Sequence, residues 1–232
     1  MSFGLSADTE YADRIRELAG KKFLTNSDAH SLPKIAREYN TFEMENISFE
    51  TFKKVLGYED EIQNNDNNEV DINKANKNIE RDSGIEIKKL NYIVCNNGMY
   101  SRLGKYNKTY CDMCESVSEI VDGKCKKCGS KKIVKGVEDR ILEIADGESI
   151  SPKERPKYNY SVPLEYIPKL GKKTKEKMLD LYDTEMNILN KVSIKNIEEN
   201  FGKQIAKNIE IARNGNITIK NGGGGIYGKL II

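Results

Sequence analysis

Four cysteines form the strongest chemical pattern in this 232-residue sequence. Cys111 and Cys114 are two residues apart, as are Cys125 and Cys128, and ten residues separate the pairs. A two-residue gap fits a tight turn that aims both sulfurs at one ion, and four thiolates suit tetrahedral zinc. Gly129, directly after Cys128, favours such a turn. The pattern predicts a structural zinc site, in which four protein ligands leave no open position for catalysis.

Two other interpretations of the cysteines fit the sequence less well. Four ordinary buried thiols would leave the repeated spacing unexplained. A redox pair would need a thioredoxin-like βαβ pattern around it, and neither pair has one. Cys95 lies outside the pattern, and we expect it to be a buried thiol.

Asp28 and His30 form a second candidate site, because they follow the short apolar run at residues 23–25. Side chains two residues apart at the end of a strand project to the same side, as metal ligands at the mouth of an α/β barrel do. The same pattern also fits a turn aspartate and an ordinary surface histidine. His30 is the single histidine, so these 232 residues cannot build a site with two imidazoles.

A third candidate site lies in a basic region. Residues 101–232 carry 25 basic and 18 acidic side chains, whereas residues 1–100 carry 13 and 18, so a polyanionic partner is expected at the C-terminal half. Residues 164–181 predict helix, turn and helix, with Pro168 ending the first element and Gly171 permitting the turn. This pattern resembles a helix-hairpin-helix, whose turn and second helix bind a DNA phosphate through backbone N–H groups.

Five residues of this hairpin are expected to contact phosphate: Lys169, Gly171, Lys172, Lys173 and Thr174. Such hairpins usually have glycine at the place of Lys169, which we expect to contribute charge instead. Eight basic and three acidic residues fall between positions 153 and 177. The alternative is that these lysines form an ordinary solvated helix face.

Recognition of a damaged base needs a pocket or a stacking group. The sequence does not choose among Tyr158, Tyr160 and Tyr227 for this role. The four glycines at residues 222–225 either approach a phosphate backbone or form a flexible end.

The elements that must position these sites follow from periodicity. We predict a helix over residues 9–20, a strand at 23–25, a helical turn from Ile35 to Tyr39, and a helix over 48–56 capped by Ser48. A strand follows at residues 91–95. Residues 193–201 and 202–214 predict two helices that share one apolar stripe, which we expect to be core.

Several classes of protein are excluded by the sequence. No apolar run approaches the roughly 18 residues of a membrane span, so no membrane partner is expected. The first residues lack the basic and apolar regions of a secretory signal, which predicts a reducing cytoplasm. No phosphate-binding loop for ATP is present, because Gly171 to Thr174 lack the earlier glycine of that motif.

Several stretches, in a consistent order, resemble the endonuclease Q family of DNA-repair nucleases. They are residues 4–9, 23–38, 102–106, the cysteine pattern, 137–140, 162–168, 222–225 and 227–228. The first two resemble the closing segment of a PHP-type metal-dependent phosphoesterase barrel. The resemblance covers nearly the whole chain apart from an asparagine-rich segment.

The resemblance implies a hydrolase that cleaves DNA next to deaminated bases such as uracil, hypoxanthine or xanthine. It implies that Asp28 and His30 are ligands of catalytic divalent ions (Mg²⁺, Mn²⁺ or Zn²⁺) that generate hydroxide. A complete PHP barrel gathers more ligands from earlier strands, and this sequence begins late in that barrel. We therefore expect these residues to be inactive alone, and a polypeptide supplying the N-terminal barrel half is a candidate partner besides duplex or single-stranded DNA.

The predicted fold is α/β with small domains. Its segments are the incomplete PHP barrel end (1–57), an Asn/Asp-rich linker (58–84), a zinc ribbon region (85–148), an all-α helix-hairpin-helix domain (149–215) and a glycine-rich tail (216–232). Two alternatives stay open. One is a non-catalytic zinc-ribbon and helix-hairpin-helix module that binds nucleic acid. The other is a PHP-type small-molecule phosphoesterase, against which the single histidine argues.

Overall fold

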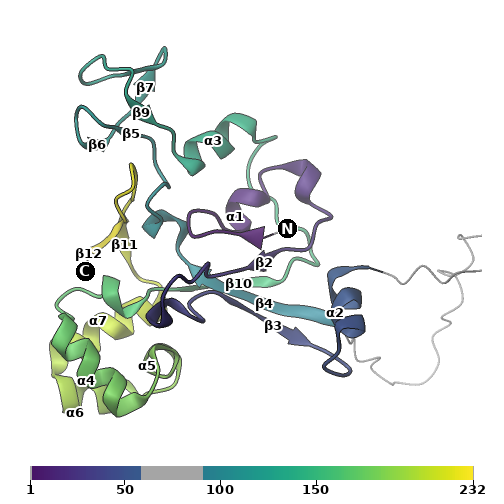
Figure 1. Cartoon of the computed structure of the whole chain (residues 1–232), viewed down its shortest axis with the longest axis vertical. Coiled ribbons are helices and arrows are strands. Elements are labelled where there is room, and N and C mark those ends of the chain that lie inside the picture. The colour runs from purple at the N-terminus through teal and green to yellow at the C-terminus, as the bar shows by residue number, and fades with distance from the viewer. Residues whose placement is uncertain (1, 59–90, 232) are drawn as a thin grey trace, which may run out of the picture. The chain divides into compact units, whose positions relative to one another are not determined.

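The computed structural model describes residues 2–58 and 91–231 (Figure 1). The predicted linker over residues 58–84 lies outside these ranges apart from Tyr58. The chain forms two compact units, unit 1 (Met1–Thr41 with Val94–Ile232) and unit 2 (Phe42–Ile93). The predicted division into five segments stays a prediction.

Unit 1 begins with two short parallel strands. In chain order its first elements are β1 (Ser2–Phe3), α1 (Thr9–Ala12), the 3₁₀ turn η1 (Arg16–Leu18) and β2 (Leu24–Thr25). The predicted helix over residues 9–20 is wrong beyond Ala12, because the next carboxylate, Asp13, is drawn into a buried ion pair with Arg155. Ile15 then takes an extended conformation, with φ −108° and ψ 106°.

A three-stranded sheet with the order β10-β4-β3 follows. Its strands are β3 (Tyr39–Glu43), β4 (Tyr92–Met99) and β10 (Lys157–Ser161), and β10 is parallel to β4. The predicted helical turn from Ile35 to Tyr39 is wrong. Only the 3₁₀ turn η2 (Leu32–Lys34) forms, and Ala36 then adopts a left-handed φ of 62°, which a right-handed helix does not allow.

The described part of unit 2 contains the helix α2 (Phe49–Leu56). The hydroxyl of Ser48 accepts a hydrogen bond from the Thr51 N–H at 3.1 Å, so the predicted helix and its cap are confirmed. The rings of Phe42 and Phe52 meet edge to face at 5.5 Å within this unit.

The middle of unit 1 holds a ribbon of short strands, hereafter the cysteine ribbon, and one helix. Its elements are the 3₁₀ turn η3 (Ser101–Leu103), β5 (Tyr110–Cys111), β6 (Ser116–Val117), β7 (Ile120–Val121), β8 (Lys124–Cys125), β9 (Ile133–Val134) and α3 (Val137–Ile144). β5 pairs with both β6 and β9, whereas β7 pairs with β8, so the ribbon consists of two small antiparallel sheets.

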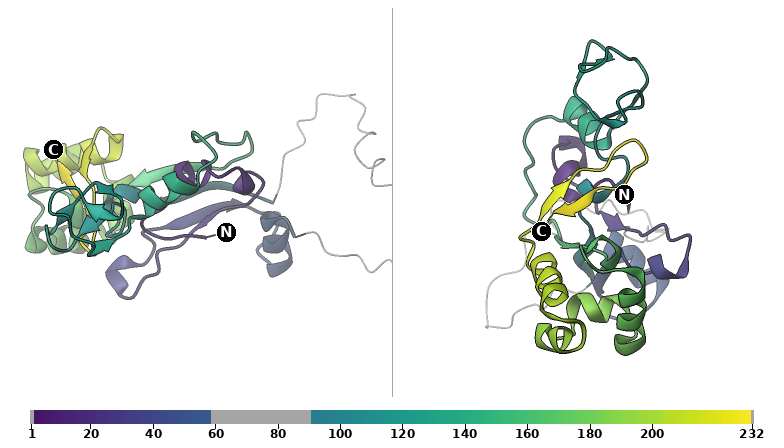
Figure 2. Two further views of the ribbon diagram at one scale, coloured as in Figure 1. Left: turned by 90° about the horizontal axis from the view of Figure 1, so that it is seen from above. Right: turned by 90° about the vertical axis from the view of Figure 1, so that its left-hand side faces the viewer.

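The C-terminal part of unit 1 is a helical group followed by a hairpin. Its elements are the 3₁₀ turn η4 (Leu164–Tyr166), α4 (Lys172–Tyr182), α5 (Glu185–Asn190), α6 (Ile194–Phe201), α7 (Lys203–Asn214), β11 (Thr218–Lys220) and β12 (Lys229–Ile231). Ile197 and Ile209 are fully buried in the main core, as the predicted stripe requires. Both views of Figure 2 show the C-terminal hairpin beside these helices, and Leu230 joins the same core.

The helices in residues 2–58 and 91–231 are all too short or too polar to cross a membrane.

The glycine run between β11 and β12 is packed against the backbone of residues 104–110. A Cβ at Gly222 would lie 2.3 Å from the carbonyl oxygen of Gly104, and one at Gly224 would lie 2.3 Å from the ring of Tyr110. Gly222 and Gly224 are therefore needed for close packing inside the fold, so the run is not a flexible end.

One buried ion pair joins the segment after α1 to the segment before β10. Arg155 donates from Nε to Asp13 Oδ1 at 2.9 Å, and the two side chains are 6% and 0% exposed. The guanidinium also lies 3.9 Å from the ring centroid of Phe23 and donates to the carbonyls of Leu18 and Ala19. The Arg155 side chain therefore holds residues 13–23, the irregular segment that follows α1, in place.

Arg155→Met should destabilise unit 1 by about 3–5 kcal/mol, because it leaves the Asp13 carboxylate buried without its partner. Chemical denaturation followed by circular dichroism measures this change. Arg140→Met is the matched control, since Arg140 pairs with Glu143 on the surface and should cost less than about 1 kcal/mol. Equal effects of the two substitutions would contradict the account.

Candidate functional site

The four cysteines meet at one end of the cysteine ribbon. Cys111 and Cys125 are buried at the ends of β5 and β8, and Cys114 and Cys128 lie in the turns that follow. The Sγ atoms of Cys111 and Cys128 are 3.7 Å apart, as are those of Cys114 and Cys125. All four sulfurs lie within 4.8 Å of one another, and they are the one group of this kind among the described residues.

These distances fit a zinc ion. A tetrahedron with metal–sulfur bonds of about 2.3 Å has edges of roughly 3.8 Å, close to the two sulfur–sulfur contacts. Gly129 has a φ of +70°, and its N–H donates to the Cys125 carbonyl at 2.8 Å, which closes the second turn. The predicted four-cysteine arrangement is therefore present in a geometry that can hold zinc.

The local electrostatics also favour a bound cation. A hydrogen bond from the Cys128 backbone N–H lowers the pKa of the Cys125 thiol to about 6. The pKa of Cys114 moves upward, first because of its contact with the Cys128 thiol. Four adjacent sulfurs cannot all be ionised without a positive charge between them, and a divalent ion supplies that charge.

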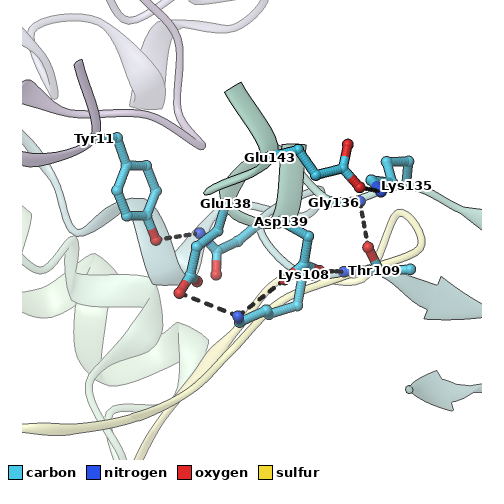
Figure 3. A network of polar contacts seen from close by, with 9 residues as sticks. Tyr11, Lys108, Thr109, Lys135, Gly136, Glu138, Asp139 and Glu143 are labelled. Carbon is cyan, nitrogen blue, oxygen red and sulfur yellow. Dashed lines mark hydrogen bonds and ion pairs between the residues drawn. The ribbon is translucent and has the colours of Figure 1, made fainter. Parts of the chain in front are cut away.

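A polar network fixes the base of the ribbon to α3 and α1 (Figure 3). Lys108 Nζ lies 3.1 Å from Glu138 and 3.2 Å from Asp139. Burial raises the pKa of Asp139, but hydrogen bonds from Thr109 and Lys108 outweigh it, so the pKa is lowered. The buried amide of Asn107 donates to the Tyr11 hydroxyl at 2.9 Å. Neither residue was predicted from the sequence to have this role.

Asp28 and His30 lie after β2, as predicted, and their side chains are near each other. Asp28 Oδ2 and His30 Nε2 are 3.4 Å apart, and both side chains are at least 85% exposed. Within the described ranges, no third histidine, cysteine or carboxylate joins them as a possible metal ligand. Their role as metal ligands stays a prediction.

The predicted hairpin of the basic region joins η4 to α4. Lys169 has a left-handed φ of 65°, a conformation that glycine adopts without strain. Gly171 precedes the first residue of α4, no side chain caps that helix end, and Lys172 and Lys173 are exposed. The first element is a 3₁₀ turn rather than the expected helix.

Two residues that the sequence analysis missed hold this hairpin in place. The fully buried Asn208 of α7 donates from Nδ2 to the carbonyl of Pro168 at 2.8 Å. Arg37, 9% exposed, lies 2.7 Å from Glu165 and 3.5 Å from Glu185. Both are polar residues whose partners are distant in sequence, so no local pattern could have identified them.

Fold and site together define a mixed α/β protein with a ribbon whose four cysteines could hold a metal ion. No family model matches the chain. The uncharacterized protein YqxK of Bacillus subtilis (strain 168) is 32% identical over 230 residues, which are 99% of this chain and 52% of that protein. The uncharacterized protein MJ0043 of Methanocaldococcus jannaschii is 35% identical over 247 residues, covering 99% of this chain and 28% of that protein.

Two solved structures are similar over the whole chain. One is the lesion-specific endonuclease PfuEndoQ from Pyrococcus furiosus, with a TM-score of 0.71, 32% identity and coverage of 54% of that chain. The other is endonuclease Q in complex with a 27-mer duplex substrate that has an abasic lesion at the active site, with a TM-score of 0.72, 32% identity and 55% coverage. The predicted resemblance is confirmed, and the chain is endonuclease Q-like along its full length. It spans about half the length of YqxK and of these two structures, and less of MJ0043.

The purified protein should contain one zinc ion per chain, and Cys125→Ser should release it, because three thiolates hold zinc much less tightly than four. Elemental analysis after gel filtration measures the zinc content. Cys95→Ser is the matched control and should keep the metal, since Cys95 lies outside the cluster. Metal-free wild-type protein, prepared without chelators, would contradict the assignment.

Proposed function

We propose that these 232 residues form the DNA-holding part of an endonuclease Q-like repair enzyme that incises DNA beside deaminated bases. The observation that carries the proposal is the similarity, over this whole chain, to an endonuclease Q structure in complex with duplex DNA. Uracil, hypoxanthine and xanthine are the proposed lesions.

Two helices whose N-cap residue is glycine support binding to the phosphate backbone of DNA. α4 begins after Gly171 and α7 begins after Gly202, and neither helix has a side chain that caps its first N–H groups. Unpaired N–H groups at a helix start attract phosphate, and the helix dipole adds to that attraction. In the proposed helix-hairpin-helix, Lys169, Lys172 and Lys173 contact the phosphate at the start of α4. Thr174, in the first turn of that helix, contacts the same phosphate through its hydroxyl.

In the same proposal, residues 1–57 are the end of a PHP-type barrel, and Asp28 and His30 are two ligands of its catalytic divalent ions. A divalent ion at such a site supplies an activated hydroxide and stabilises charge on the phosphate. The exposed pair Asp28 and His30 offers only two ligand groups. We therefore propose that the 232 residues by themselves bind DNA without cleaving it. The zinc ion of the cysteine ribbon is proposed to stabilise the fold.

Lys172→Ala/Lys173→Ala should weaken binding to a uracil-containing duplex and lower the slope of log K against log salt by about two, because two phosphate contacts are lost. Fluorescence anisotropy with a labelled duplex, titrated between low and physiological salt, measures both quantities.

Lys191→Ala/Lys195→Ala is the control, because both lysines are exposed in the same helical group but belong neither to the hairpin before α4 nor to α4 itself. Wild-type affinity and slope in the Lys172/Lys173 variant would refute the role of the hairpin. Absence of DNA binding by the wild-type chain would refute the proposed function as a whole.

A further inference from the structure

An open groove lies between the cysteine ribbon and the C-terminal hairpin, with a volume of about 640 Å³. The ribbon contributes Tyr110, Val117 and Lys127, and the hairpin contributes residues 219–229 in part. The two walls are joined by a β-bridge between Lys108 and Gly223, and the hairpin loop lies beside the base of the ribbon (Figure 1). The volume is in the range that binds small organic ligands.

The hairpin wall of this groove carries two lysines that face each other. Lys220 of β11 and Lys229 of β12 are directly opposite in the antiparallel register, so their side chains lie on the same face of the hairpin. Like charges in this arrangement destabilise a hairpin. Neither lysine, nor Lys127 across the groove, forms an ion pair with a described residue, and Glu115 is the one carboxylate among the lining residues. An anion between the lysines would relieve the repulsion.

The groove also offers an aromatic ring and exposed apolar surface. Tyr227 lines it, and its ring meets that of Tyr166 edge to face at 6.0 Å. Ile226 and Val117, which also line the groove, are 55% and 40% exposed, so aliphatic surface is open to a ligand there. A ring and aliphatic groups next to several lysines can bind a ligand that is flat at one end and anionic at the other.

The other two tyrosines that the sequence left open are engaged elsewhere. Tyr160 is packed against the rings of Tyr100 and Tyr158, with centroid distances of 4.6 and 4.7 Å. The hydroxyl of Tyr158 donates to the Met99 carbonyl at 3.4 Å, and burial raises its pKa. Tyr227 is thus the tyrosine of the three that combines an open groove with adjacent lysines.

We propose that this groove binds one unpaired nucleotide of a DNA strand, with the base on Tyr227 and Ile226 and its phosphates at Lys220, Lys229 and Lys127. The inference rests on the proposed DNA-binding function and names a contact beyond the hairpin. Tyr166, against which Tyr227 packs, belongs to η4, the first element of that hairpin. One wall of the groove is therefore in direct contact with the hairpin that leads into α4.

The probe is a labelled duplex with a single unpaired 2-aminopurine bulge, compared with the same duplex fully paired. The wild-type chain should prefer the bulged duplex and quench 2-aminopurine fluorescence by stacking. Tyr227→Ala should lose the quenching and weaken binding of the bulged duplex about tenfold, whereas Tyr227→Phe should keep both. Lys54→Ala/Tyr58→Ala, which removes one exposed lysine and one exposed tyrosine from unit 2, should behave as wild type.

Lys220→Gln/Lys229→Gln gives an independent measurement. It should reduce affinity for the bulged duplex and also raise the melting temperature of the free protein, because it removes the cross-strand repulsion. Unchanged binding and quenching in both Tyr227→Ala and the lysine variant would overturn the proposal that the groove binds a nucleotide. If Lys172→Ala/Lys173→Ala still loses affinity in that case, the proposed function survives. No binding of either duplex by the wild-type chain overturns both.

Discussion

The arrangement of unit 1 depends on one stretch of backbone, residues 102–110, which receives hydrogen bonds from two sides. From the C-terminal loop, the N–H of Gly222 donates to Arg102 and the N–H of Gly228 donates to Leu103, at 2.9 and 3.0 Å. From the start of α3, the N–H groups of residues 137 and 138 donate to residues 106 and 107, at 2.9 and 3.0 Å. Such direct backbone contact leaves no room for side chains. A Cβ at Gly136 would lie 2.3 Å from the Thr109 nitrogen.

This constraint links the sites to one another. The cysteine ribbon continues directly from residue 110, so its base is fixed by the same contacts. A metal ion held by the four cysteines would order the rest of the ribbon. The C-terminal hairpin is held beside the ribbon, which creates the groove, and Leu230 anchors it in the core that also supports α4 and α7. Ion pairs also attach the base of the ribbon to α3, because Lys108 lies between the carboxylates of Glu138 and Asp139 (Figure 3).

Local sequence patterns predicted the features that depend on neighbours along the chain. The cysteine spacing, the Ser48 cap and the apolar stripe of α6 and α7 are of this kind, and the structure has all three. The patterns failed where distant residues decide the conformation. Asp13 ends α1 because of Arg155, 142 residues later, and the glycine run is required by residues 104–110. Periodicity carries no information about such partners, so the groove could not be foreseen either.

The central claim is that these residues hold DNA near a deaminated base but do not supply a complete metal-dependent cleavage site. The most direct measurement uses a 5′-labelled duplex with one uracil or hypoxanthine, incubated with the chain and Mg²⁺ or Mn²⁺, and resolved on paired native and denaturing gels. The account predicts a salt-sensitive shift on the native gel and an intact strand on the denaturing gel. A nick beside the lesion would contradict it, because catalysis would then need metal ligands other than Asp28 and His30 within these 232 residues.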